Sequence, residues 1–120
     1  MEPVITIKDQ HFYYAGIPDL VAFSADNKCA VIIDEDQVQH LLDANPIIDG
    51  KHINQIIVIS EQLHSSLTRL SGFRVFSMVA ADLDEAVRFA IFSAELNDHV
   101  FCITNVDKPK VKEIIELVMI

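Results

Sequence analysis

The sequence predicts a single α/β domain over residues 1–120, with three layers: a mostly parallel sheet, helices on both of its faces, and an N-terminal β-hairpin. Two observations lead to this fold class. Apolar runs without polar alternation, such as 29–33 and 99–103, are typical of strands buried on both faces. Between such runs, apolar residues recur at helical spacing, which is typical of helices that cover a sheet. No shift in composition marks a second domain.

The elements are expected in a regular order. A hairpin at 4–7 and 11–14 has its polar turn at 8–10, and it should add antiparallel pairing at one edge of the sheet. Buried strands are predicted at 29–33, 55–59, 73–79 and 99–103. Helices are predicted at 18–25, 36–42, 61–70, 82–96 and 108–119. Pro18 suits a first helical turn, Gly72 ends a helix, and the segment 44–52 with its proline and glycine is a loop.

Charge and motif content exclude several classes of function. The net charge of −9, from 18 acidic and 9 basic residues, argues against nucleic acid and against an anionic membrane surface as partners. Neither G-x-x-x-x-G-K-[ST] nor G-x-G-x-x-G occurs, so no nucleotide cofactor is expected. The five histidines share no metal-ligand spacing, and no metal site is expected.

The two cysteines and the N-terminus indicate a cytoplasmic protein. Cys29 and Cys102 each lie in an apolar, strand-like run and are read as buried reduced thiols. Whether the two are close in space is left open, because the order of the strands is not readable from the chain. No signal sequence and no membrane-spanning stretch is seen.

Two features suggest a partner. Apolar residues make up 51% of a 120-residue chain, which is more than one small core readily covers, so we expect a homodimer. Phe12, Tyr13 and Tyr14 form an aromatic triplet in the hairpin, and alternate members must face opposite sides. The triplet is read either as a partner surface or as core packing at a sheet edge.

Polar residues follow the predicted strands at the edge where α/β sheets bind ligands. Asp34, Glu35 and Asp36 follow one strand, and they suit either a magnesium ion or N-capping of the next helix. Ser60 follows the next strand and reads as an N-cap, because it lacks the glycines of a nucleophile elbow. Asp82 reads as the cap of an acid-rich helical turn. The ligand-binding candidates are therefore Asp34, Asp36, Ser60, Thr104 and Asn105, and no catalytic residue is assigned.

The order of elements also carries a family resemblance. An aromatic strand closes the hairpin, and the stretch 81–90, ADLDEAVRFA, opens a helix that is followed by Asn97-Asp98 and the strand 99–103. This pattern resembles the C-terminal domain of the Mur ligases, nearest the ligase that adds D-glutamate to UDP-N-acetylmuramoyl-L-alanine. The resemblance implies the three-layer fold over nearly the whole chain.

The motifs that serve catalysis in that family are missing. The family places G-G-x-D-K after the buried strand, where its lysine meets the substrate carboxylate; this chain has Asp34-Glu35-Asp36-Gln37. An acidic triplet there would repel D-glutamate. The family's D-S-x-x-T-N motif is replaced by 15–19, and its S-P-x-x-x-S loop by 104–107, where only Thr104 substitutes for a serine.

Taken together, the sequence predicts a non-catalytic, stand-alone Mur-ligase C-terminal-like domain that acts as a binding or protein-interaction module, with an unidentified protein partner or small ligand. Two alternatives use Asp34 and Asp36. One is a small magnesium-dependent or phosphate-handling enzyme. The other is a degenerate receiver-like domain, which Lys108-Pro109 would also suit, although Ser60 stands where a receiver carries its phospho-accepting aspartate.

Overall fold

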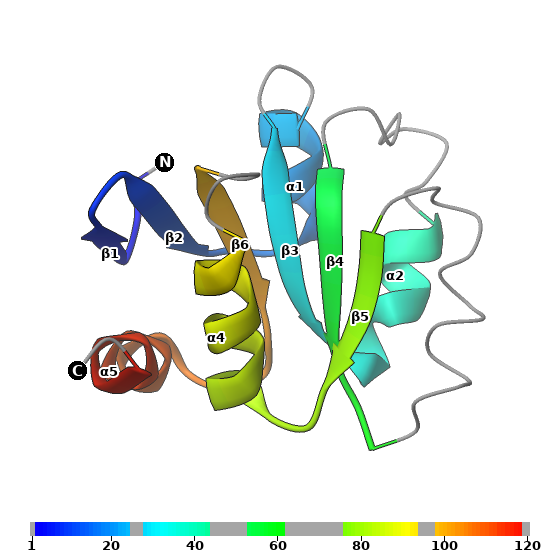
Figure 1. The fold of residues 1–120 in the computed structure, drawn as a ribbon. Coiled ribbons are helices and arrows are strands. Elements are labelled where there is room, and N and C mark those ends of the chain that lie inside the picture. The colour runs from blue at the N-terminus through cyan, green and yellow to red at the C-terminus, as the bar shows by residue number, and fades with distance from the viewer. Residues whose placement is uncertain (1, 25–27, 44–52, 62–75, 94–97, 119–120) are drawn as a thin grey trace.

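The computed structural model describes residues 2–24, 28–43, 53–61, 76–93 and 98–118. They form one six-stranded sheet in the order β1-β2-β6-β3-β4-β5 (Figure 1). The strands are β1 (Ile5–Ile7), β2 (Gln10–Tyr14), β3 (Cys29–Asp34), β4 (Ile53–Ile59), β5 (Phe76–Ala80) and β6 (His99–Ile103). Only β1 and β2 pair antiparallel, while the other four pairs are parallel. The predicted α/β class and the hairpin at the sheet edge are confirmed.

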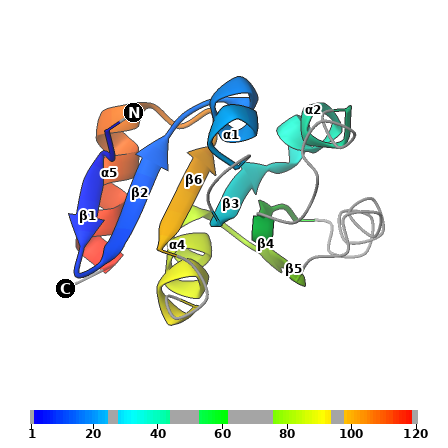
Figure 2. The ribbon, with the colours of Figure 1, turned by 90° about the horizontal axis from the view of Figure 1, so that it is seen from above.

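Helices cover both faces of this sheet (Figure 2). One face carries α1 (Ile17–Ser24) and the short 3-10 helix η1 (Glu35–Gln37), which leads directly into α2 (Val38–Asp43). The other face carries α4 (Leu83–Phe92) and α5 (Lys108–Val118). The predicted boundaries of these elements agree within a few residues. The predicted helix at 61–70 and loop at 44–52, together with parts of the predicted segments 73–79 and 82–96, lie outside the described residues.

Alternate residues of the central strands enter two separate cores. On the α1 and α2 side, Val31, Ile33 and Phe101 pack with Leu20 and Leu41. The core on the other side joins strand residues to α4 and α5: Phe12, Ala30, Ile32, Val100, Cys102, Val87, Val111 and Ile115. Both faces of β3 and β6 are therefore buried, and this is why their sequences are apolar runs without alternation.

The two cysteines enter opposite cores. Cys29 lies with the residues of the α1 and α2 side, and Cys102 with those of the α4 and α5 side. Both are fully buried free thiols. Side chains on opposite faces of a sheet have Cβ atoms that point apart, so the pair is unable to form a disulfide in this fold.

The aromatic triplet is divided between the two cores. Phe12 is fully buried and Tyr13 is 5% exposed, and they face opposite sides of the sheet. Tyr14 is half-buried at the end of β2. Core packing therefore describes Phe12 and Tyr13, and the partner surface proposed for them is not available in the folded domain. The reason is that β2 is an interior strand, flanked by β1 and β6.

Asp82 caps α4 as its sequence predicts. The Asp82 carboxylate accepts a 2.9 Å hydrogen bond from the backbone amide of Glu85. In return the Glu85 carboxylate accepts a 3.1 Å hydrogen bond from the backbone amide of Ala81. The Glu85 amide, which the first helical turn would leave unpaired, and the Ala81 amide just before the cap are thus both satisfied. This fixes where the chain leaves β5 and enters α4, the helix that leads back to β6.

Replacing this cap should destabilise the domain measurably. Asp82→Ala removes the acceptor for the Glu85 amide, and we expect it to lower the free energy of unfolding by about 1 kcal/mol. Asp82→Asn keeps an acceptor and should lose only a fraction of that. Asp84→Ala, an exposed neighbour in the same turn, is the control. Urea denaturation measures all three, and equal losses for Asp82→Ala and Asp84→Ala would contradict the capping role.

Candidate functional site

A set of hydrogen bonds joins the carboxyl ends of β3 and β6. The Asp34 carboxylate oxygen Oδ2 accepts a 2.9 Å hydrogen bond from the Thr104 hydroxyl and a 2.8 Å hydrogen bond from the Asn105 backbone amide. One carboxylate oxygen at the end of β3 therefore holds the first two residues after β6. We call Asp34, Asp36, Thr104 and Asn105 the β3–β6 clamp.

Asp36 and the Thr104 hydroxyl complete the clamp. The Asn105 side-chain amide donates to the Asp36 carboxylate at 2.7 Å. The Thr104 hydroxyl donates to Asp34 and also accepts a 3.2 Å hydrogen bond from the Val106 backbone amide. The Thr104 hydroxyl thus connects the Asp34 carboxylate with the backbone of the segment that follows β6.

Of the two roles that the sequence allows for Asp34, N-capping is met in position but not in hydrogen bonding. Asp34 occupies the N-cap position of η1, but its side chain makes no capping hydrogen bond there. The carboxylate points instead to partners 70 and 71 residues away in sequence. Two hydrogen bonds from the residues after a neighbouring strand stabilise the carboxylate more than a single bond from an amide of a three-residue helix would.

A pocket opens beside the clamp. It has a volume of about 360 Å³ and is lined by Tyr14, Ala15, Gly16, Gln37, Ile103 and Thr104. These residues follow β2 and β6 or lie in η1. The strands β2 and β6 are neighbours in the sheet, but the chain leaves them in opposite directions. After β2 it crosses to the α1 face, and after β6 it crosses to the α5 face. The pocket lies at the point where these two connections separate. This is the position at which open α/β sheets bind ligands.

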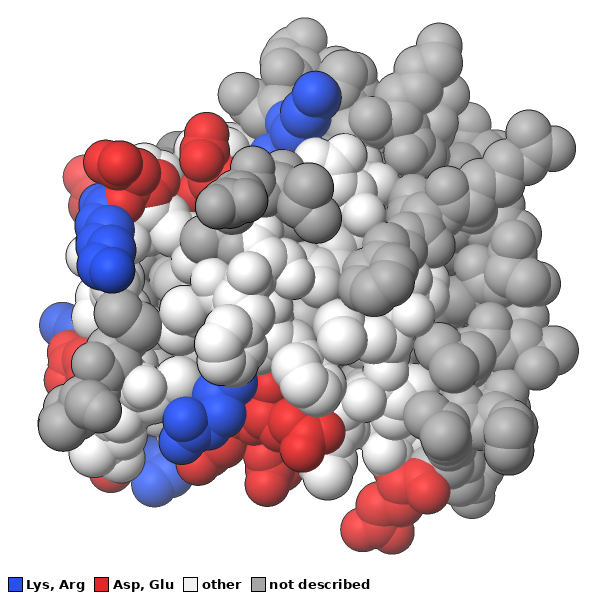
Figure 3. Space-filling model, viewed as in Figure 1, with Lys and Arg blue, Asp and Glu red and all other residues white. Residues whose placement is uncertain are grey.

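The pocket wall combines neutral polar groups with nearby negative charge. None of the residues that line it carries a charged side chain. Asp34 adjoins it through Thr104, and Asp36 precedes the lining residue Gln37. Figure 3 shows a separate group of acidic side chains on the α4 face, near the lower edge of the view where α4 begins. A cation or a neutral polar group is favoured here over an anion.

Ser60 lies apart from the clamp. It is 8% exposed at the end of β4, where its backbone amide donates to the Ala80 carbonyl at 3.0 Å. It does not line the pocket. The structure therefore brings together Asp34, Asp36, Thr104 and Asn105 of the candidate ligand residues, and it places Ser60 on the β4–β5 side of the sheet.

Catalytic chemistry through metals or thiols has no geometric support in the described part of the chain. No group of three or more His, Cys, Asp or Glu side chains is arranged there to hold a metal ion. Burial raises the pKa of the Cys29 thiol to about 12. Burial, with the Asp34 charge adding to it, raises the pKa of Cys102 to about 12. Both thiols are protonated at neutral pH and are poor nucleophiles.

Strand order does not fit the receiver alternative. Numbered along the chain, the five parallel strands here run 1-5-2-3-4, because β6 lies between β2 and β3. The doubly wound order of receiver-like sheets is 2-1-3-4-5. Lys108 also lines a different pocket, together with Glu2 and Val4, rather than the one beside Asp34.

A second polar cluster lies at the opposite end of β2 and β6. His11 and His99 are register partners, and their rings stack with centroids 5.3 Å apart. The Tyr13 hydroxyl and His99 Nδ1 are hydrogen-bonded at 2.9 Å, and Thr6 Oγ1 and His11 Nδ1 are likewise 2.9 Å apart. Burial lowers the pKa of His99, and the neighbouring His11 lowers it further, while Asp98 opposes both effects. Sequence reasoning missed this pair, although both histidines stand at strand starts.

Comparisons with known proteins support the fold. No protein-family model and no curated protein matches the sequence. One solved structure matches 98% of this chain and 98% of its own chain, with a TM-score of 0.65 and 13% sequence identity. It is the crystal structure of a domain assigned to a UDP-N-acetylmuramate:L-alanyl-γ-D-glutamyl-meso-diaminopimelate ligase of Haemophilus ducreyi 35000HP. The chain has the fold of a Mur ligase domain.

The likeness at 13% identity carries the Mur-ligase-like fold and not an activity. Which member of the family is nearest stays a prediction, as does the homodimer.

Phe92, 86% exposed, and Leu117, 58% exposed, are the large apolar side chains that the described residues leave on the surface. No helix of the described residues is long and apolar enough to cross a membrane.

Removing the clamp acceptor should cost more than removing a cap. Asp34→Ala leaves the Thr104 hydroxyl and the Asn105 amide without their acceptor, so we expect a loss of about 1–3 kcal/mol in the free energy of unfolding. Asp36→Ala, at an exposed position with one side-chain partner, should cost less than about 0.5 kcal/mol. Urea denaturation compares them. A smaller loss for Asp34→Ala than for Asp36→Ala would contradict the clamp.

Stability should fall with acid through His99. Because the pKa of His99 is lower in the folded state than the unfolded value of about 6.5, the unfolded chain binds the proton first. The contribution of neutral His99 to the free energy of unfolding is complete above about pH 6.5. It is lost as the pH falls toward the pKa of His99 in the folded state. His99→Gln should reduce the difference in urea midpoint between pH 7.5 and 5.5, whereas His40→Gln, at an exposed site on α2, should leave it unchanged. Equal pH profiles for wild type and His99→Gln would contradict this role.

Proposed function

We propose that this Mur-ligase-like domain is a binding module, and that it takes a small neutral or amine-bearing ligand in the pocket beside the β3–β6 clamp without acting on it chemically. The observation that carries the proposal is the pocket itself, at the point where the β2 and β6 connections diverge. Its volume of about 360 Å³ lies within the range of ligand sites.

The charge around the pocket supports the ligand class. Tyr14 and Gln37 provide neutral hydrogen-bonding side chains in the pocket wall, and the Gln37 Oε1 also lies 3.1 Å from His40 Nδ1. The adjoining Asp34 and Asp36 carboxylates are engaged with hydroxyl and amide donors, and no ion pair between them and a described Lys or Arg supplies a compensating charge. An approaching carboxylate would be repelled, and an amine attracted.

The engaged hydroxyl favours binding over catalysis. An acyl or phosphoryl transfer at this site would require a nucleophile with a base beside it. The Thr104 hydroxyl is next to a carboxylate, but it also accepts the Val106 amide, which keeps it in the loop. The clamp thus serves to hold the pocket wall at β6 rigid, and rigid walls are what a binding site needs.

The test is a titration followed by two-dimensional amide NMR, with butylamine, acetamide and butyrate as probes. We expect saturable shifts at Gln37, Thr104 and Gly16 with butylamine or acetamide, and no shifts of these three amides with butyrate. Gln37→Leu should weaken this binding by about three- to tenfold, since it removes a hydrogen bond worth about 1 kcal/mol. Gln39→Leu, on the adjoining α2 and outside the pocket, should not.

Two results would overturn the proposal. One is butyrate shifting the same amides as strongly as butylamine, which would mean that the acidic surroundings do not select the ligand. The other is shifts spread evenly over the surface and insensitive to Gln37→Leu. Turnover of a bound probe, seen as new resonances, would replace the binding role with an enzymatic one.

A further inference from the structure

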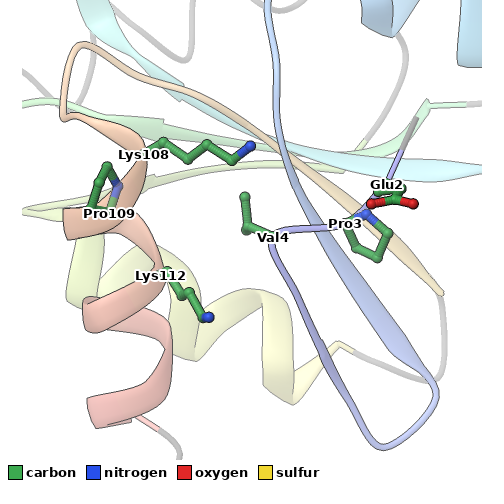
Figure 4. Close-up of a pocket in the computed structure, with 6 residues that line it drawn as sticks. All are labelled: Glu2, Pro3, Val4, Lys108, Pro109 and Lys112. Carbon is green, nitrogen blue, oxygen red and sulfur yellow. The ribbon is translucent and has the colours of Figure 1, made fainter.

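A second pocket, which shares no lining residue with the first, lies between α5 and the N-terminal segment. It has a volume of about 400 Å³ and is lined by Glu2, Pro3, Val4, Lys108, Pro109 and Lys112. Figure 4 shows the Lys108 side chain extending from α5 toward Val4, with Lys112 one helical turn further along α5 and Glu2 and Pro3 on the opposite side of the pocket. We infer that this pocket binds a small anion, a phosphate or carboxylate group attached to a short apolar body.

Both walls of the pocket are fixed by the rest of the fold. On one side, the Val4 backbone amide donates to the Phe12 carbonyl at 2.8 Å, which ties the N-terminal segment to β2. On the other side, α5 is anchored by Val111 and Ile115, both fully buried. Phe12, Val111 and Ile115 belong to one core, and Val4 packs against it. The cavity therefore lies between two parts of the chain that are held against a common core.

The positive charge of the pocket is unusual in this chain. The net charge is −9, yet α5 begins with Lys108 and Lys110, and its first turn contains no acidic residue. Cations in the first turn of a helix are opposed by the helix dipole, so Lys108 at this position costs stability instead of adding it. A lysine that is unfavourable for helix stability at this position supports a role of Lys108 in binding an anion.

The two lysines that line the pocket keep their ammonium groups accessible. Lys108 forms no ion pair among the described residues. Lys112 has a long contact of 3.9 Å with Glu116, in which both side chains are more than half exposed. Pairs of this kind contribute little, so Lys112 can turn to an anion at small cost.

The α5 backbone does not supply the binding groups. Pro109 has no amide hydrogen, and the amides of Lys110 and Val111 donate to the Asp107 carbonyl. Recognition thus falls to the ammonium groups of Lys108 and Lys112, with Pro3, Val4 and the lysine stems offering apolar contact. Glu2 on the opposite wall competes with the anion for the same charges.

Butyl phosphate is the probe, titrated at constant ionic strength and followed by amide NMR, with butylamine as the negative control. We expect saturable shifts at Val4, Lys108 and Lys112, with a dissociation constant of about 1 mM. Lys108→Gln and Lys112→Gln should each weaken binding by about two- to fivefold, which corresponds to an exposed charge pair. Glu2→Gln should tighten it.

The matched control is Lys110→Gln. Lys110 lies on the same helix and pairs with Glu113 at 3.6 Å, but it does not line the pocket. It should leave binding unchanged, as should Gln37→Leu in the first pocket, so this inference and the proposed function can fail separately. If Lys110→Gln weakens the binding of butyl phosphate as much as Lys108→Gln does, then the general positive charge of α5, and not the pocket, attracts the anion. Such a result, or the absence of saturable shifts, would overturn the inference.

Discussion

The insertion of β6 between β2 and β3 is the constraint on which the rest of the structure depends. β2 and β3 make no direct contact as sheet neighbours, and both are held by hydrogen bonds to the same five-residue strand. The carboxyl end of β6 brings Thr104 and Asn105 to Asp34, and its amino end brings His99 to His11 and Tyr13. The clamp and the stacked-histidine cluster are thus both consequences of the same pairing.

The segment that connects β6 to α5 has surroundings of opposite charge at its two ends, and one of the two pockets lies at each end. The segment after β6 first passes the clamp, where the Asp34 and Asp36 carboxylates accept three hydrogen bonds, and then enters α5, whose first turn carries lysines and no acid. A short stretch of chain therefore contributes to an electronegative wall and, a few residues later, to an electropositive one. If both proposals hold, this separation lets one small domain select ligands by charge at each pocket independently.

The sequence predicts strands well where both faces are buried. The predicted 99–103 coincides with β6, and 29–33 falls one residue short of β3, because a short apolar run bounded by polar residues is typical of a strand buried on both faces. The rule that ligands bind at the carboxyl ends of strands also grouped Asp34 with Thr104 correctly. Strand order is what the sequence does not contain. Without strand order, the sequence leaves Asp34 as either an N-cap or a magnesium ligand, although its hydrogen-bond partners lie 70 residues away, and the stacked histidines are not recognisable as neighbours.

The late position of β6 in the chain has a further consequence for how the domain folds. Tyr13 and His99 are 86 residues apart in sequence, so the central pairing closes a loop that spans most of the polypeptide. Until that loop closes, β2 and β3 each present an open edge to solvent, and the apolar edge of β3 is competent to pair with another chain. Long-range parallel pairing of this kind is slow, and it makes folding an all-or-none event for the whole sheet. The strand most exposed to misassembly is therefore β3, which also lies at the centre of the native sheet.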